Sequence, residues 1–294
     1  MDETVRLWLT TLFIGKQGSS DVLPKLVSVI IPTRNADRKI EKCLLSIKNQ
    51  TYKNIEILVI DAFSTDNSLK IISRFGTKVF SLEGERSKAK NFGISKSIGE
   101  FLLFIDSDMI LEHRVVEECV KVCSNNKGIV GVIIPERSVG SGFWIKVRDF
   151  EKRLYVGSDI ESARFFIKKF VTQVGGFDEE IIWYEEATLP QKLRDNELNV
   201  NARISSFILH DEEGFNLVKC LDKKRYYSVS SRLYSQKYEK YARKQSTVMS
   251  RLNIFLEKGN WKMLIRHPIL SIGMIILKTL EYFSSNRHVF TAGK

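Results

Sequence analysis

Continuous apolar segments alternate with amphipathic segments along the chain from Val27 onward. Two runs rich in β-branched residues, Val27–Ile31 and Ile55–Ile60, end at Pro32 and Asp61. Short apolar runs bounded by such residues are typical of buried strands. Similar runs predict further strands at residues 78–82, 101–105 and 128–134.

Between these runs the apolar positions recur with the period of an α-helix. Ile40, Leu44 and Ile47 lie on one face of a predicted helix over residues 37–49. Further helices are predicted around residues 69–72, 88–97 and 113–123. Strand–helix alternation with wholly apolar strands predicts an α/β fold, in which helices cover both faces of a mostly parallel sheet. Ligands of such sheets bind beyond the carboxyl ends of the strands. The polar residues there are therefore candidate site residues: Thr33, Asp61, Asp106 and Asp108.

The positive charge of the chain is concentrated towards its C-terminus. Residues 213–294 contain 16 Lys or Arg and 5 Asp or Glu, which accounts for the whole net charge of +11. The same region is rich in tyrosine, as in Lys223–Tyr227. We divide the chain into an N-terminal extension (1–26), an α/β domain (27–212) and a basic helical region (213–294). The basic region indicates an anionic partner, which is a membrane surface, a nucleic acid or a phosphorylated substrate.

Two apolar stretches and the number of cysteines indicate where in the cell the protein is located. Leu7–Ile14 follows Asp2 and Glu3 rather than a basic segment, so we expect no signal peptide. Ile269–Leu277 is too short to span a bilayer. Beside basic and aromatic residues it suits a helix lying on anionic lipid, although a core helix has the same pattern. Four cysteines in 294 residues do not indicate a disulfide scaffold. We expect a cytoplasmic protein, peripheral on the cytoplasmic face of the membrane.

Asp106-Ser107-Asp108 is the first candidate for chemistry. Residues i and i+2 at a strand end point the same way, so the two carboxylates repel each other unless a cation lies between them. Oxygen ligands favour Mg²⁺ or Mn²⁺ over zinc. By itself the triplet is more typical of a solvated turn after a strand than of a catalytic site. The chain contains no Walker-type loop, no Gly-x-Gly-x-x-Gly and no His-Glu-x-x-His, so nucleotide or zinc chemistry through those motifs is excluded.

Six short motifs occur in an order that resembles the family 2 glycosyltransferases of the GT-A fold, over about residues 27–212. The motifs are Val29–Asn35, Ile57–Asp61 with Ser64–Ser68, Ala89–Ile94, Gly99–Asp108, Gly175–Glu179 and Glu185-Glu186. The resemblance implies a Rossmann-like GT-A sheet with a helical C-terminal appendage. It also implies an inverting, metal-dependent enzyme that moves a sugar from a nucleotide-sugar donor to an acceptor.

The resemblance also implies roles for individual residues. Those expected to bind the nucleotide sugar are Pro32, Thr33, Asn35, Asp61, Ser64, Arg86, Lys90, Asp106 and Ser107. Asp108, with Asp106 and His210, would hold Mn²⁺ or Mg²⁺. Glu186 stands where the family has its catalytic carboxylate. The family usually has Glu-Asp there and this chain has Glu-Glu, so the base is either Glu185 or Glu186.

The acceptor side would be formed by Gly175, Gly176, Phe177 and Trp183, facing a glycan or a lipid-linked acceptor. Three other functions stay open. A catalytically inactive GT-A scaffold at a membrane would bind donor without turnover. A nucleic-acid-binding protein would use the basic region, but no binding motif supports it and we expect no nucleic acid partner. A nucleotidyltransferase would need a glycine-rich basic loop after the first strand, which we do not find.

Overall fold

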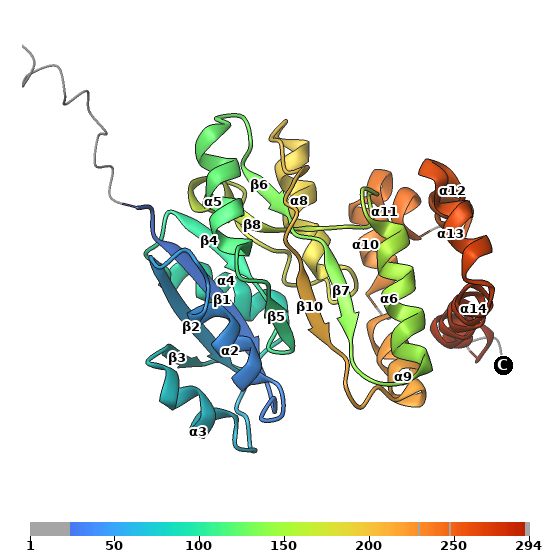
Figure 1. Cartoon of the computed structure of the whole chain (residues 1–294), viewed down its shortest axis with the longest axis horizontal. Coiled ribbons are helices and arrows are strands. Elements are labelled where there is room, and N and C mark those ends of the chain that lie inside the picture. Colours follow the sequence, from blue (N-terminus) through green and yellow to red (C-terminus); the bar gives the residue numbers. More distant parts are fainter. Residues whose placement is uncertain (1–23, 229, 247, 292–294) are drawn as a thin grey trace, which may run out of the picture.

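The computed structural model describes residues 24–291 except residues 229 and 247 (Figure 1). Leu7–Ile14 and most of the proposed N-terminal extension lie outside the described residues. The centre is a seven-stranded sheet with the order β3-β2-β1-β4-β8-β6-β9. Its strands are β1 (Val27–Thr33), β2 (Ile55–Asp61), β3 (Lys78–Ser81), β4 (Phe101–Phe104), β6 (Gly131–Ile133), β8 (Ala163–Ile167) and β9 (Ala202–Arg203).

The sheet is mostly parallel, which confirms the predicted fold class. Strands β1 to β4 pair in parallel, and β8 runs antiparallel to both β4 and β6. The apolar pattern did not single out β8 as a strand, because Arg164 interrupts its apolar residues. Arg164 is buried and forms an ion pair with Glu136 at 2.7 Å, so its charge is compensated inside the fold.

Helices cover both faces of this sheet. On one face lie α2 (Ile40–Lys48), α3 (Ser68–Ile72) and α5 (Val115–Asn125), whose apolar sides pack on Val29 and Ile31. On the other lie α4 (Arg86–Lys96), α7 (Lys168–Gln173) and α8 (Glu185–Asp195), with contacts to Ile30 and Phe104. Alternate residues of β1 thus enter different cores, as expected for a strand buried on both sides.

A second, three-stranded sheet stands beside the first. It consists of β5 (Met109–Leu111), β10 (Ile208–Asp211) and β7 (Glu136–Val139), in the order β5-β10-β7. Strand β10 runs antiparallel to β5, with His210 opposite Met109. Residues 105–108 connect β4 of the large sheet to β5 of the small one. The Asp106–Asp108 triplet therefore lies where the two sheets meet.

The remaining helices gather on the side of the molecule opposite β3 (Figure 1). They are α6 (Phe143–Tyr155), α9 (Leu217–Ser228), α10 (Ser231–Lys237), α11 (Glu239–Ser246), α12 (Val248–Leu256), the short helix Glu257–Gly259, α13 (Asn260–Arg266) and α14 (Pro268–Thr291). Phe150 and Leu154 of α6 form a common core with Met274 and Leu277 of α14. The basic region thus packs on the α/β body through shared apolar clusters.

No single helix in the described part of the chain is long and apolar enough to cross a membrane. One pair of segments, Met249–Arg266 and Pro268–Ser285, meets the length and composition criteria together, but its two halves are bent by 114°.

Candidate active site

The loops after β1 and β2 are tied together at the carboxyl edge of the sheet. Thr33 and Asp61 are paired in register, and both are buried. The Asp61 carboxylate accepts hydrogen bonds from the Ser64 backbone N–H (2.9 Å) and hydroxyl (2.5 Å). Asn35, in a left-handed conformation at φ 47°, donates its N–H to the Ser64 hydroxyl at 2.8 Å. These contacts fix the predicted donor-binding loops in one arrangement. Pro32 lies within β1 opposite Ile60.

Arg86, the first residue of α4, joins two acidic elements that are far apart in the sequence. Its guanidinium lies 4.0 Å from Asp106 Oδ2 and 3.6 Å from Glu185 Oε1. It also donates to the Tyr227 hydroxyl at 3.2 Å and lies over that ring. Burial opposes ionisation of Asp106, but the charges of Lys90 and Arg86 outweigh it and lower the pKa of this carboxyl well below its usual value. Asp106 is therefore ionised.

Lys90 forms a buried ion pair with Glu185. The ammonium is 2.9 Å from Oε1 and 3.1 Å from Oε2, and the two side chains are only 1% and 3% exposed. From the motifs, Lys90 is predicted to bind the donor. In the structure its amine is bound to the first residue of α8 and lies over the Phe177 ring at 5.1 Å. Lys90 therefore orients Glu185.

Glu186 differs from Glu185 in having no ion pair with any described residue, and its carboxylate accepts the N–H of its own backbone. Burial raises the pKa of Glu186, and the negative charge of Glu185 raises it further, while Arg86 and Lys90 act in the opposite direction. The two neighbouring glutamates thus have different environments. Glu185 is paired with Lys90 and Arg86, whereas Glu186 has no cation within ion-pair distance and has an increased proton affinity.

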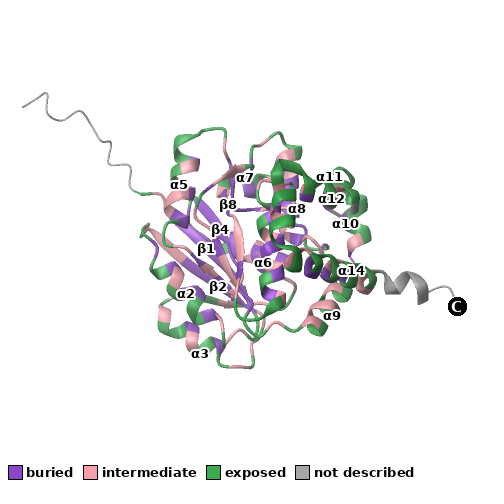
Figure 2. Cartoon of the chain, turned by 45° about the vertical axis from the view of Figure 1, so that its right-hand side comes forward, coloured by how far each residue is buried: buried purple, intermediate pink, exposed green. Residues whose placement is uncertain are grey.

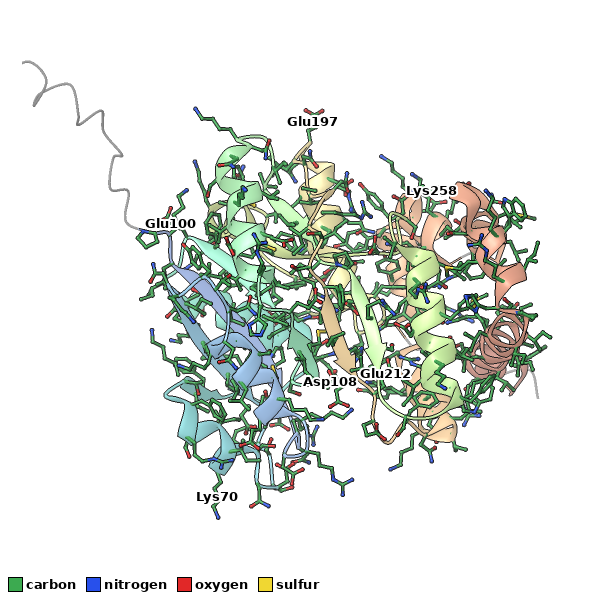
Figure 3. The ribbon with its side chains drawn as sticks, viewed as in Figure 1. Lys70, Glu100, Asp108, Glu197, Glu212 and Lys258 are labelled. Carbon is green, nitrogen blue, oxygen red and sulfur yellow. The ribbon has the colours of Figure 1, made fainter. Side chains whose placement is uncertain are left out.

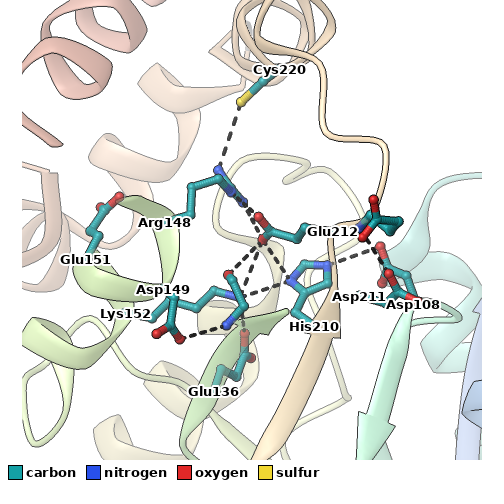
Figure 4. A network of polar contacts seen from close by, with 12 residues as sticks. Asp108, Glu136, Arg148, Asp149, Glu151, Lys152, His210, Asp211, Glu212 and Cys220 are labelled. Carbon is teal, nitrogen blue, oxygen red and sulfur yellow. Dashed lines mark hydrogen bonds and ion pairs between the residues drawn. The ribbon is translucent and has the colours of Figure 1, made fainter. Parts of the chain in front are cut away.

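Asp108 and His210 meet at the junction of the two sheets. Asp108 Oδ2 lies 3.1 Å from His210 Nε2, and His210 Nδ1 lies 3.1 Å from Lys152 Nζ on α6 (Figure 4). Glu212 lies 3.6 Å from the same ring nitrogen and is paired with Arg148. Figure 3 shows Asp108 and Glu212 near the middle of the molecule, between the large sheet and α6.

The donor atoms at this junction have the chemistry that Mg²⁺ or Mn²⁺ requires. Asp106 Oδ1 is buried and has no hydrogen-bond partner among the described residues, so it is an acceptor without a donor. Asp108 is one-third exposed and adds a second carboxylate, and His210 adds an imidazole. Among the described residues, however, no group of three or more His, Cys, Asp and Glu side chains is already arranged to hold a metal ion. These residues fit such an ion chemically, but their side chains are not yet gathered around one point.

Of the predicted acceptor-side residues, the two glycines form a tight turn and Phe177 belongs to the core. Gly175 and Gly176 both have positive φ, at 74° and 68°. A Cβ on Gly176 would lie 2.4 Å from Asn91 Oδ1, which accepts the Phe177 N–H at 2.8 Å, so glycine is required there. The Phe177 ring is buried edge-on against Phe104 and forms part of the core.

Trp183 is more open and connects to the basic region. Its backbone N–H donates to the Ser230 hydroxyl at 2.7 Å, and Lys224 lies 5.2 Å from its ring centroid. The loop that leads into Glu185 and Glu186 is therefore anchored by the C-terminal helices.

Three further residues shape this site and were not predicted from the sequence. Tyr227 covers Arg86, Lys152 contacts His210, and Glu136 pairs with Arg164 and lies 3.5 Å from Lys152. Tyr227 belonged to a cluster noted for its composition, but nothing in the sequence connected that cluster to α4. The partners of Lys152 and Glu136 come from different strands and helices, so no local pattern could have indicated them.

The structure brings together the α/β sheet, the acid pair after β4 and the acid pair that opens α8, as the order of the motifs predicts. Residues 28–181, just over half of the chain, match the model of the family described as glycosyl transferase family 2. The chain belongs to this family, which confirms the resemblance.

Curated relatives support this assignment. Glycosyltransferase GlyG of Streptococcus pneumoniae is 37% identical over 102 residues, which is 32% of this chain and 34% of that protein. The poly(ribitol-phosphate) β-N-acetylglucosaminyltransferase TarP of Staphylococcus aureus is 32% identical over 152 residues, 48% of this chain and 46% of that protein. The matched region thus spans less than half the length of these relatives.

Solved structures show the same fold at lower identity. The mannosyltransferase PcManGT from Pyrobaculum calidifontis, in complex with GDP-Man and Mn²⁺, aligns with a TM-score of 0.60 at 14% identity, over 96% of this chain and 91% of that one. Residues 1–349 of TarS from S. aureus, in complex with UDP-GlcNAc, align with a TM-score of 0.53 at 21% identity, over 70% and 66%.

Proposed function

We propose that this glycosyltransferase transfers a sugar, with inversion, from a nucleoside diphosphate sugar to an acceptor hydroxyl, with the help of Mn²⁺ or Mg²⁺. One observation carries the proposal. Arg86 contacts both Asp106 and Glu185 and so places the acid pair at the donor edge of the sheet beside the acid pair that opens α8. A donor phosphate site and a proton acceptor are thereby within reach of one substrate.

The donor would lie along the edge formed by the loops after β1 and β2. Asp61 and Thr33 would face the base, and Asp106 the ribose. TarS in complex with UDP-GlcNAc and PcManGT in complex with GDP-Man and Mn²⁺ have the same fold. Both UDP- and GDP-sugars therefore belong in a donor screen.

The metal would be held by Asp108, with Asp106 and His210. When bound, such an ion neutralises the negative charge that grows on the departing diphosphate. The chain supplies further positive charge of its own in Arg86, which lies next to Asp106. Asp106, ionised and with one oxygen unpartnered, supplies a negative ligand without first losing a proton.

Glu186 would be the general base. Its carboxylate is free of ion pairs, and its raised pKa increases its affinity for the proton of the acceptor hydroxyl. The acceptor oxygen forms a bond to the anomeric carbon from the side opposite the diphosphate. The bond to the diphosphate breaks, and the hydroxyl proton moves to Glu186. Glu185, neutralised by Lys90, is a positioning residue that sets the first turn of α8.

The acceptor would be a glycan or a lipid-linked glycan that enters beside Trp183. An aromatic face stacks well on a sugar ring, and Lys224 over Trp183 would attract an acidic acceptor. TarP, which resembles this chain over part of its length, has a phosphate-containing polymer as its acceptor. We also propose a cytoplasmic location, supported by four cysteines that are all free thiols.

The test is a donor screen on the purified chain. Release of nucleoside diphosphate is measured for UDP-, GDP- and dTDP-sugars with Mn²⁺, Mg²⁺ or EDTA. The wild type is compared with Asp108→Ala and with Asp222→Ala, an exposed residue of α9. We expect metal-dependent release from one donor, lost in Asp108→Ala and kept in Asp222→Ala. Donor binding by calorimetry without any release, even with acceptors added, would indicate an inactive scaffold. Absence of donor binding, with salt-sensitive retention on nucleic acid, would refute the proposal.

A further inference from the structure

Helix α14 exposes apolar side chains and turns its charged side chains towards the body of the protein. A helix on the surface of a protein in water is expected to do the reverse. Every exposed side chain from Pro268 to Phe283 is uncharged, and most are large and apolar. Ile269, Ile272, Ile276, Leu280 and Phe283 follow one another at intervals of three or four residues, so they form one stripe. Ile269 is 72% exposed, and Figure 2 shows exposure along this helix.

The charged residues of the same segment point towards the body instead. Lys278 forms ion pairs with Glu151 of α6 at 2.6 Å and with Glu281 at 2.8 Å. Beside them, Met274 and Leu277 are buried against α6, and a Cβ on Gly273 would lie 2.7 Å from the Phe143 ring. The inner side of α14 is therefore fixed by packing and by the partly buried Lys278–Glu151 ion pair. The helix cannot roll its apolar stripe inwards without breaking these contacts.

The helices that precede α14 extend this composition and add cations. Trp261 and Ile265 of α13 are 46% and 69% exposed, and Leu256 at the end of α12 is 61% exposed. Lys262 and Arg266 of α13 are exposed among them, and Lys262 lies 5.7 Å from the Trp261 ring centroid. An apolar surface with tryptophan and basic residues at its margin is typical of proteins that lie in the interface of a bilayer.

We propose that this α13–α14 face, defined by Trp261, Lys262, Ile265, Arg266 and the α14 stripe, docks on the surface of a membrane rich in anionic lipid. The apolar side chains enter the boundary between headgroups and acyl chains, and Lys262 and Arg266 contact the lipid phosphates.

A second copy of the chain is the other occupant that could cover an apolar face. A two-fold interface brings the same patch of both copies together. Such an interface would enclose Lys262 and Arg266 of both copies, within a region that carries 16 basic and 5 acidic residues in each chain. Anionic lipid compensates this charge, whereas a second copy adds to it.

Docking in this way orients the catalytic domain. Helices α12 to α14 lie on the side of the molecule opposite β2 and β3, which border the proposed donor edge (Figure 1). The donor edge would face the aqueous phase, from which a nucleotide sugar arrives. This consequence rests on the proposed function, but the docking itself does not.

The test is flotation of the full-length chain with vesicles, without donor or metal. Vesicles of phosphatidylcholine alone are compared with vesicles that contain about 30% phosphatidylglycerol. The variant Ile272→Glu/Ile276→Glu places charge on the α14 stripe. Ile98→Glu is the matched control, since Ile98 is 70% exposed on the α/β domain. Both variants change only exposed side chains, so both should fold, and this is checked by circular dichroism.

We expect the wild type and Ile98→Glu to bind anionic vesicles, and the double variant to bind at least about tenfold more weakly. Lys262→Glu/Arg266→Glu should reduce the preference for phosphatidylglycerol. Brominated acyl chains should quench the fluorescence of Trp261, and Trp261→Phe should remove that part of the quenching.

Three results would overturn the proposal. One is a wild-type chain that floats with neither kind of vesicle. Another is equal loss of binding in Ile98→Glu and in the double variant. The third is a dimer in lipid-free solution that Ile272→Glu/Ile276→Glu converts to monomer, because this face would then be an interface between copies. Since no donor is used, failure here leaves the proposed glycosyl transfer untouched.

Discussion

The neighbouring glutamates at the start of α8 allow the reasoning about the site to be tested with one conservative change at each position. In Glu186→Gln the proton acceptor is lost while the shape is kept. General base catalysis contributes about 10²- to 10⁴-fold, so we expect kcat to fall by that factor, equivalent to about 3–5 kcal/mol in the activation barrier. Folding stability should not fall, because burial and the charge of Glu185 already disfavour ionised Glu186.

In Glu185→Gln we expect the reverse, a clear loss of folding stability and a smaller loss of activity. It leaves the Lys90 ammonium, 1% exposed, beside a neutral amide. Breaking a buried ion pair costs about 3–5 kcal/mol, and we expect the lower end because Gln keeps an acceptor oxygen and Asp106 also attracts Lys90. Activity, measured where the variant is still folded, should fall less than in Glu186→Gln.

The assay combines urea unfolding of both variants with nucleoside diphosphate release at saturating donor and acceptor. Glu185→Gln should lose more folding stability than Glu186→Gln, and Glu186→Gln should lose more activity than Glu185→Gln. A stable Glu185→Gln without activity, together with an active Glu186→Gln, would show that the assignment of base and positioning residue is reversed. Equal loss of stability in both would mean that the difference in pairing has no energetic consequence.

Three further predictions concern the pKa of Glu186, the Lys90–Glu185 ion pair and the buried thiol of Cys123. Because the pKa of Glu186 is raised in the folded state, it stabilises the fold at low pH, and this contribution is lost as pH rises through that pKa. The stability of Glu186→Gln relative to the wild type should therefore increase from acidic to neutral pH in urea unfolding, and a constant difference would contradict the raised pKa. Lys90→Met should lower stability by about 3 kcal/mol, and Lys90→Met/Glu185→Leu should recover most of it in a double-mutant cycle; simple additivity would contradict the ion pair. Burial raises the pKa of Cys123 to about 12, so iodoacetamide should label it about a thousandfold more slowly in native than in unfolded protein, as followed by peptide mass spectrometry. Rapid native labelling would show that Cys123 is accessible.

The parts of the fold that the sequence predicted are those with a local signal. The runs that became β1 and β2 each contain four or more apolar residues with a single polar one, Ser28 or Glu56, and end at a proline or an aspartate. Burial on both faces could therefore be inferred without knowing their neighbours. Strand β8 lacked this signal, because the charge of Arg164 is acceptable inside the fold only once Glu136 is known to lie 2.7 Å away. The small sheet was missed for a similar reason, since its strands are short and come from distant segments.

In the candidate site, too, the sequence predicted where the acidic residues lie along the chain, but not the environment that packing gives each of them. The order of the motifs predicted Asp106, Asp108 and the Glu185-Glu186 pair at strand and helix ends, and the structure places them just after β4 and at the start of α8. Nothing in the sequence distinguishes two adjacent glutamates. Lys90 and Arg86, brought by α4, neutralise Glu185 and leave Glu186 free. A pKa depends on the charges and burial around a group, and these are properties of packing.

The C-terminal region shows how far composition alone determines a surface. The sequence determined that this region carries the net charge of the chain and an apolar run at Ile269–Leu277. It left open whether that run is a core helix or an interfacial one, because an apolar side has the same periodicity in both cases. Only the tertiary structure decided which side of α14 points inwards. The Lys278–Glu151 ion pair holds the charged side against α6, and the isoleucine stripe is left on the outside.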